Sequence, residues 1–141
     1  KKGDLEKVEN IIERFKNYKN FNYDLSVSYV KSYKKSKILI TDLSSTAYTY
    51  AFSNEKPVIF FSKNENKLKK DYFSDLNYFK DRQKIGYVVT NVRNIINIVQ
   101  KINSKKNTIK RKIINLRKKR IFYLGKSVKK TLKEIDAINT N

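Results

Sequence analysis

The sequence predicts an α/β fold, a Rossmann-like parallel sheet with crossover helices, followed by basic helices at the C-terminal end. Two observations lead to this prediction. Short, almost wholly apolar runs at residues 38–41, 58–61 and 85–90 are typical of strands buried on both faces. Segments with helical patterns separate these runs, and such alternation favours parallel strands joined by crossover helices.

The segment before the first expected strand contains two candidate helices. Residues 4–19 have the pattern of an amphipathic helix with Asp4 as a candidate N-cap. The apolar residues on one face of this helix are Leu5, Val8, Ile12 and Phe15. A strand or extended piece is expected at residues 21–25, after which Ser26 caps a short helix that ends at Tyr33.

Between and after the strands, a helix rich in small residues is expected at 45–52, and Asn91 caps the helix that follows the third strand. The inward-facing residues of that later helix are Val92, Ile95, Ile96, Val99 and Ile102. Residues 62–84 are polar with scattered aromatics, and they form the least regular segment. The acids of this segment are expected to be solvated: Asp71, Asp75 and Asp81.

Two basic amphipathic helices are predicted at the C-terminal end. The apolar residues are Ile109, Ile113 and Leu116 in the first helix and Leu124, Val128, Leu132 and Ile135 in the second, and they could line the domain's own core or enter a membrane interface. We therefore expect a Rossmann-like domain at residues 1–104, with residues 105–141 as helices that pack on it or extend from it.

The basic charge of the chain is concentrated in one region. The net charge is +20, and residues 82–133 contain seventeen Lys or Arg and no Asp or Glu. The abundance of Lys, Asn, Ile, Tyr and Phe could reflect an AT-rich genome, but that cause alone would spread the charge more evenly. A polyanionic partner is the other explanation. The candidate membrane or anion patch consists of Lys110, Arg111, Arg117, Lys118, Lys119 and Arg120.

Three interpretations of this basic region are open. A solvated helix face ranks first, and attachment to an anionic membrane surface ranks second. Nucleic-acid binding ranks third, because only Phe122 and Tyr123 offer aromatic platforms within the basic stretch and no recognition-helix motif is present.

Missing residue types exclude several chemistries. The chain has no Cys, which excludes disulfides and thiolate chemistry, and no His, so a catalytic base within it would be a carboxylate, Lys or Tyr. No metal site and no cofactor are predicted. No apolar run approaches the ~18–20 residues that span a bilayer.

The turn at residues 42–46 is the candidate binding site. It follows an expected buried strand and precedes a helix, and ligands of open parallel sheets bind beyond the carboxyl ends of the strands. The helix start offers N–H groups and a positive dipole end suited to phosphate, to which Ser44, Ser45 and Thr46 would add hydroxyls. The alternative is a serine N-cap without a ligand, worth about 1 kcal/mol.

One detail of this turn favours a ligand. A capping box would place Glu or Gln three residues after the cap, but Ala47 follows Ser44 and Tyr48 follows Ser45 at that spacing. Asp42 would repel a phosphate if it pointed inward, so we expect it to orient the turn. No GxGxxG motif is present.

Residues 36–61, "SKILITDLSSTAYTYAFSNEKPVIFF", resemble the CDP-glycerol glycerophosphotransferase family, bacterial enzymes that polymerise teichoic acid and related surface polymers. The family pattern has the form "DILITDYSSVxFDYAxLxKPVIFF". The similarity extends over roughly residues 5–102, with "YKNFNYDLS" before the motif and "DRQKIGYVVTNVRNIINIVQKI" after it. Leu43 stands where the family usually has Tyr.

The resemblance implies the C-terminal half of a GT-B fold, in which residues 1–104 bind the donor nucleotide. Ser44, Ser45 and Thr46 would contact the phosphates of a CDP-linked donor, and Asp42 would shape the turn. The family's functional histidines have no counterpart here, so the catalytic residues stay unassigned, and we expect this chain alone to be inactive, as a piece of a longer transferase.

The resemblance also implies partners and a location. They are a nucleotide-diphosphate donor, a polymer or lipid-linked acceptor, and the N-terminal GT-B domain of the whole protein. The protein would be cytoplasmic, either free or peripheral at the inner face of the cell membrane. The transferred unit would be glycerophosphate or a sugar, and the rival interpretation is a basic nucleic-acid-binding α/β module.

Overall fold

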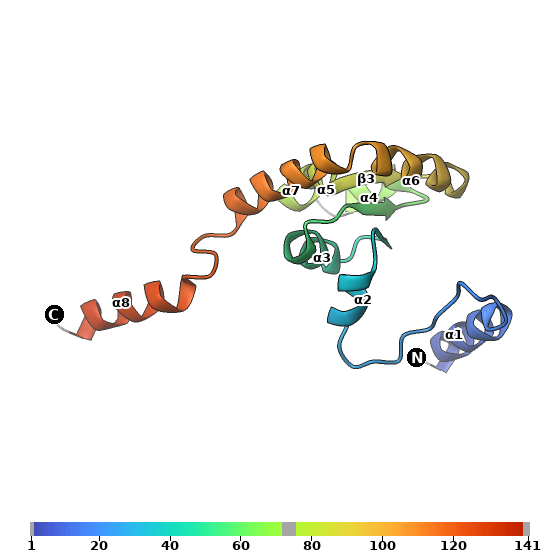
Figure 1. The fold of residues 1–141 in the computed structure, drawn as a ribbon, viewed down its shortest axis with the longest axis horizontal. Coiled ribbons are helices and arrows are strands. Elements are labelled where there is room, and N and C mark those ends of the chain that lie inside the picture. The colour runs from blue at the N-terminus through green and yellow to red at the C-terminus, as the bar shows by residue number, and fades with distance from the viewer. Residues whose placement is uncertain (1, 72–75, 140–141) are drawn as a thin grey trace. The chain divides into compact units, whose positions relative to one another are not determined.

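The computed structural model describes residues 2–71 and 76–139. The chain divides into two compact units, residues 1–34 and residues 35–141. The sheet and the helices that cover it all belong to the second unit (Figure 1). The expected division at residue 104 stays a prediction.

The first unit contains helix α1, Lys2–Phe15. Asp4 lies in the first turn of α1, so the prediction that it is the N-cap was wrong, because the helix begins two residues earlier. The apolar face of α1 is largely exposed, and the ring of Phe15 contacts those of Tyr18 and Phe21. Residues 21–25 form no strand.

Helix α2, Val30–Lys35, spans the point at which the chain divides. It begins later than expected, because the hydroxyl of Ser28 accepts a hydrogen bond from Val30 N at 3.4 Å. Ser26 instead bonds to Asp24 and to the carbonyl of Ser28, so it does not cap the helix.

The second unit is built on a three-stranded parallel sheet in the order β1-β2-β3. The strands are β1 (Leu39–Thr41), β2 (Val58–Phe61) and β3 (Gly86–Val89). Leu39 pairs with Val58, and Val58 pairs with Gly86. All three expected strands are present, and the predicted α/β class with a parallel sheet is confirmed.

Strand β1 is more exposed than its apolar sequence predicts. It lies at the edge of the sheet and pairs only with β2. The side chain of Ile40 is 50% exposed, whereas Ile59, which pairs with it in β2, is fully buried. The expectation that residues 38–41 are buried on both faces was therefore wrong, because the face of β1 that carries Ile40 is left open to solvent.

Crossover helices connect the strands. Helix α3 (Thr46–Asn54) joins β1 to β2, and α4 (Glu65–Asp71) and α5 (Asn77–Ile85) lie between β2 and β3. The segment 62–84 thus contains two helices where the sequence predicted irregular structure. Asp75 lies outside the described residues.

After β3, a 3₁₀ turn (Val92–Asn94) leads into α6 (Ile95–Ser104). The predicted cap is confirmed, since the side chain of Asn91 accepts a hydrogen bond from Arg93 N at 3.0 Å. Ile102 is buried, but Val92 and Ile96 are exposed, so only part of the expected apolar face points inward.

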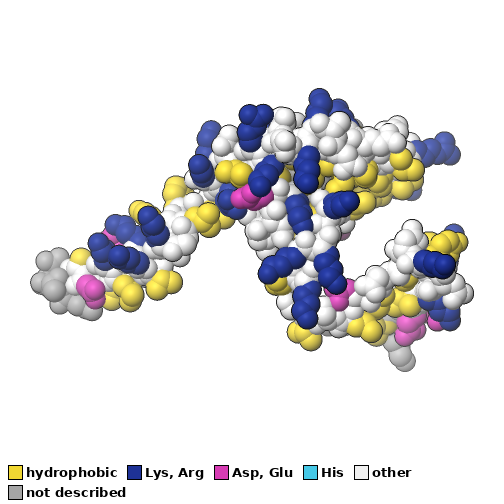
Figure 2. All heavy atoms as spheres, in the orientation of Figure 1, with side chains coloured by type: hydrophobic (Ala, Val, Ile, Leu, Met, Phe, Trp, Pro, Cys, Tyr) yellow, Lys and Arg dark blue, Asp and Glu magenta, His cyan; other side chains and the backbone are white. Residues whose placement is uncertain are grey.

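Two further helices follow, α7 (Lys106–Arg120) and α8 (Ser127–Asn139). The apolar residues of α7 lie in the core: Ile109, Ile113 and Leu116 are buried. Helix α7 packs against α5 and α3. Of the two open roles for the apolar residues in and just before α8, the structure does not place them in the core, because all four are exposed: Leu124, Val128, Leu132 and Ile135. They lie on one side of the helix or just before it, and lysines occupy the other side (Figure 2).

Candidate functional site

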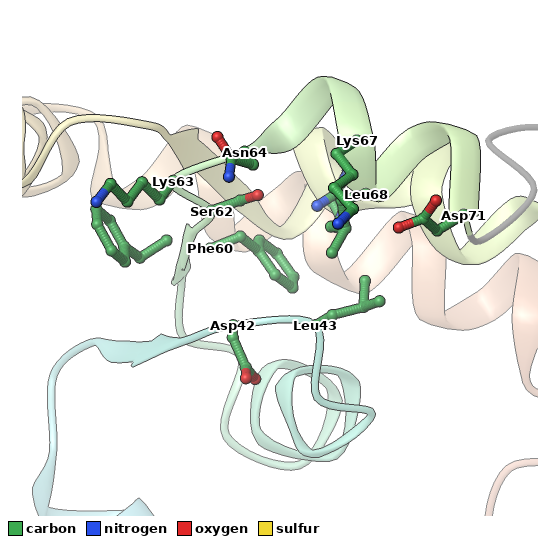
Figure 3. A pocket seen from close by; sticks show the side chains of 11 residues that line it. Asp42, Leu43, Phe60, Ser62, Lys63, Asn64, Lys67, Leu68 and Asp71 are labelled. Atoms are coloured by element: carbon green, nitrogen blue, oxygen red, sulfur yellow. The ribbon is translucent and has the colours of Figure 1, made fainter.

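A cavity of about 460 Å³ opens at the carboxyl ends of β1 and β2. Asp42 and Leu43, which directly follow β1, lie on one side, and α4 supplies the opposite side (Figure 3). Phe60 lies between them. The remaining lining residues are Phe61, Ser62, Lys63, Asn64, Lys67, Leu68, Asp71 and Arg82. The cavity therefore occupies the place where open parallel sheets bind their ligands.

Three cations line this cavity, and they differ in how they are held. Lys63 and Lys67 are exposed, whereas Arg82 is only 3% exposed. The guanidinium of Arg82 pairs with Glu65 at 2.5 and 3.3 Å and lies 4.4 Å from the ring centre of Phe79. Its Nε is buried and has no hydrogen-bond partner among the described residues. Arg82 thus holds a fixed guanidinium in the cavity wall, and the carboxylate of Glu65 offsets part of its charge.

The Ser44–Thr46 turn lies directly beside this cavity, but its three residues do not line it. The Ser44 hydroxyl accepts a hydrogen bond from Thr46 N at 3.3 Å, and Ala47 N and Tyr48 N bond to the carbonyls of Ser44 and Ser45. Ser44 therefore acts as the side-chain cap of α3, and a phosphate would have to replace these internal bonds. The Ser45 side chain is exposed and available to a ligand.

Asp42 is exposed, and its carboxylate points away from the labelled side chains of α4 (Figure 3). Within residues 2–71 and 76–139, no hydrogen bond joins this carboxylate to the turn. Its role in orienting the turn stays a prediction.

Two tyrosines fix the start of α3 against α5. The hydroxyl of Tyr48 donates a 2.5 Å hydrogen bond to the backbone carbonyl of Tyr78. Burial, reinforced by the negative charge of Asp81, raises the pKa of Tyr48 above its usual 10.0, and burial likewise raises the pKa of Tyr78. Both phenols stay protonated at neutral pH, so they act here as structural groups and are poor candidates for a base.

Asp81, expected to be a solvated loop acid, is 2% exposed. It accepts from Lys84 Nζ at 2.7 Å and from Arg120 Nε at 2.6 Å. Burial alone would raise the pKa of Asp81, but these two cations outweigh burial and lower the pKa below its usual 3.8. The prediction was wrong because helix α5 directs this side chain inward against α7.

The predicted anion patch divides into paired and unpaired cations. Lys110 and Arg117 contact Glu55 at 3.0 and 2.8 Å, and Arg120 contacts Asp81. The other three, Arg111, Lys118 and Lys119, form no ion pair within the part of the chain that the structure describes. Figure 2 shows dark blue side chains along the segment that Figure 1 labels α7.

We expect the stability of residues 35–141 to fall as the solution is acidified. Hydrogen bonds from Lys110 and Arg117 lower the pKa of Glu55 below its usual 4.5, as Arg120 and Lys84 do for Asp81. When folding lowers the pKa of a carboxyl group, the stability that results is fully present at pH values above the pKa of the unfolded chain. It is lost as the pH falls through the pKa of the folded protein. Urea midpoints measured from about pH 6 down to about pH 3 should decline below the usual carboxyl pKa values.

Asp81→Asn is the matching variant for this pH dependence. It should be less stable near neutrality, because Arg120 and Lys84 lose their anion, and its midpoint should change less with pH. If the urea midpoint of this variant fell with decreasing pH as steeply as that of the unaltered chain, the result would contradict a role for Asp81 in the pH dependence.

The sequence predicted the edge of the sheet at which the cavity lies, but three of its residues were missed. Lys63 lies two residues after the end of β2, so the strand-end argument marks its region but does not single out this lysine. Lys67 lies two residues into a helix that was not predicted, and Arg82 is buried through contacts with residues distant in sequence.

A parallel sheet with crossover helices and a cation-lined cavity at its carboxyl edge defines the class of α/β proteins whose sites suit phosphorylated ligands. Within that class, the chain belongs to the CDP-glycerol:poly(glycerophosphate) glycerophosphotransferase family, whose model matches residues 6–135. The resemblance noted from the sequence is thereby confirmed, and the family is one of transferases. No curated protein and no solved structure matches the chain.

Among the residues that the structure describes, no helix combines the length and the apolar character needed to span a bilayer.

Proposed function

We propose that this chain binds the donor for a transferase that moves glycerophosphate from a CDP-glycerol-like nucleotide to a cell-surface polymer. The main observation in support is the position of the 460 Å³ cavity, at the carboxyl ends of β1 and β2 and beside the start of α3. The family match supplies the reaction type.

The reaction that this family description implies has a defined charge flow. A hydroxyl of the acceptor attacks the phosphorus that carries glycerol and gives up its proton to a base that this chain does not supply, the bond to the nucleotide's inner phosphate breaks, and CMP leaves with the electron pair. Negative charge grows on the departing phosphate, so fixed cations nearby favour the transition state. Lys63, Lys67 and Arg82 are placed to supply them.

Other groups at the cavity suit the rest of such a donor. The exposed Ser45 hydroxyl offers a donor to phosphate, and the Asp71 carboxylate offers an acceptor to hydroxyls of ribose or glycerol. The proposal assigns no catalytic base to this chain. We expect the chain by itself to bind nucleotide weakly and not to turn over, with an N-terminal GT-B domain completing the site at the membrane's inner face.

Replacement of Lys63 and Lys67 by Gln should weaken CDP-glycerol binding about tenfold or more, because two charged donors to phosphate are lost. Isothermal titration calorimetry with CDP-glycerol and CDP would measure this change. Both side chains are exposed, so we expect the fold to be retained.

The control variant removes two exposed lysines outside the cavity, Lys70→Gln with Lys106→Gln, and should bind like the unaltered chain. Ser45→Ala should weaken binding without unfolding α3, because this hydroxyl makes no cap bond. Full nucleotide affinity in both the double lysine variant and Ser45→Ala would place the donor elsewhere and overturn the proposal.

A further inference from the structure

Helix α7 carries more positive charge than its own fold can neutralise. Lys110 and Arg117 share Glu55, and Arg120 is paired with Asp81 and bonded to Asn77 at 2.7 Å. These cations flank the buried side of the helix, and intramolecular carboxylates balance them. These cations have a structural role, and a partner could bind them only if their ion pairs were broken.

Besides Lys106 in its first turn, α7 carries four other cations that are exposed: Arg111, Lys112, Lys118 and Lys119. Within the described ranges 2–71 and 76–139, none of these four pairs with a carboxylate. We call these four residues the outer cationic face. The spacing of seven residues places Lys118 above Arg111 and Lys119 above Lys112, about 10 Å further along the helix.

A hollow of about 230 Å³ lies beside this face. It is lined by Lys84, Lys112 and Lys119, together with the amide of Asn115 and the side chain of Leu116. Three lysines from two helices thus surround a space that can hold a phosphate group. No carboxylate lines the hollow, although Asp81 holds Lys84 from outside it.

A favourable interaction with the helix dipole accounts for only two of the four cations of the outer cationic face. Lys118 and Lys119 lie in the last turn of α7, where cations interact favourably with the helix dipole. Arg111 and Lys112 lie two turns earlier, beyond the reach of this effect. Their charge repels that of Lys110, and no carboxylate of the described residues balances it, so an anion bound there would relieve the repulsion.

The end of α7 lies at the same edge of the sheet as the cavity. Arg120 binds Asn77, the first residue of α5, and α5 leads directly into β3. The first turn of α5 therefore lies toward the carboxyl end of the strands. An anionic chain on the outer cationic face would extend toward the proposed donor site.

We propose that the outer cationic face of α7, with the hollow at Lys84, holds the acceptor, a polyanionic chain of glycerol phosphodiesters. The choice of partner rests on the proposed function and on the family's description, since such a polymer carries one negative charge per repeat. A flexible polyphosphate backbone needs spaced cations, and the outer cationic face provides them in two rows.

The same face fits other polyanions less well. Single-stranded nucleic acid is held partly by stacking on aromatic side chains, and α7 contains no aromatic residue. A membrane-surface helix needs apolar residues that enter the lipid, and the exposed positions of α7 are Lys, Arg, Asn and Thr. Charge without stacking or apolar anchors favours a polymer of phosphodiesters.

The test is binding of a fluorescent synthetic glycerol phosphate oligomer, measured by anisotropy at low and high salt. The variant Arg111→Gln, Lys112→Gln, Lys118→Gln, Lys119→Gln should bind at least about tenfold more weakly and lose most of its salt dependence. The control removes four charges from the first unit, Lys7→Gln, Lys16→Gln, Lys19→Gln and Lys31→Gln, and should bind like the unaltered chain.

Retained affinity in the first variant, or an equal loss in the control, would overturn the proposal. Tighter binding of oligouridylate of equal charge, or of anionic phosphatidylglycerol vesicles, would also overturn it. CDP binding distinguishes the two proposals: the outer-face variant should keep it. A chain that binds the oligomer through α7 but binds no nucleotide would refute the donor site alone.

Discussion

Gly86→Ala should lower the free energy of unfolding of residues 35–141 by about 3 kcal/mol or more, at the upper end of the usual cost of overpacking. A Cβ at this position would lie 1.7 Å from the carbonyl oxygen of Val58 and 2.6 Å from its carbon. Both atoms belong to the backbone of β2, the central strand, which cannot move aside without breaking its pairing with β1 or β3. The expected loss of stability comes from the close approach of β2 and β3. Backbone strain does not contribute, because the φ of Gly86, 174°, is extended.

Gly125→Ala is the matched control. Gly125 has φ +73°, but nothing lies within 4 Å of the position of its Cβ. Its replacement should cost only the left-handed strain, about 1–2 kcal/mol, and only in the connection between α7 and α8. Urea unfolding followed by circular dichroism would compare the two variants. A Gly86→Ala midpoint at or above that of Gly125→Ala would show that the strands can separate at little cost.

The apolar runs predict β2 and β3 to within one residue because these strands are short, buried and followed by polar turns. They do not predict the exposure of Ile40, since whether a face of β1 is left open to solvent depends on the fold. The sequence pattern fails to predict helix α5 for another reason. Asp81 and Arg82 lie in its buried part, and their partners Arg120 and Glu65 are far away in sequence. A hydrophobic pattern cannot identify residues that are buried through charge pairing.

The same limit applies to the candidate site. The strand-end argument predicts the edge of the sheet at which the cavity lies, but of residues 42–46 only Asp42 and Leu43 line it, and the binding role of the turn stays a prediction. It cannot select Lys63 and Lys67 from 33 Lys and Arg residues. Only the fold shows which of these cations share a cavity, and which, like Arg117, are already neutralised by a carboxylate of another helix.

Arg82→Met should lower the free energy of unfolding by about 3 kcal/mol, because it leaves the carboxylate of Glu65 nearly buried without its main partner. The Glu65 side chain is 10% exposed, and its next cation, Lys69, lies 3.9 Å away on the exposed surface. The methionine can still fill the space beside Phe60 and Phe79, so loss of the charge pair should dominate the effect.

The double variant Glu65→Gln, Arg82→Met separates stability from binding. It removes both charges of the pair and should recover most of the lost stability, since a buried ion pair replaced as a unit costs little. Its urea midpoint should therefore lie well above that of Arg82→Met, and strictly additive losses would show that the two residues do not interact. Its affinity for CDP should nevertheless stay low, because the fixed cation in the cavity wall is gone. A double variant that regained both stability and full CDP affinity would assign Arg82 to the fold alone and leave Lys63 and Lys67 as the only cations for the donor phosphates.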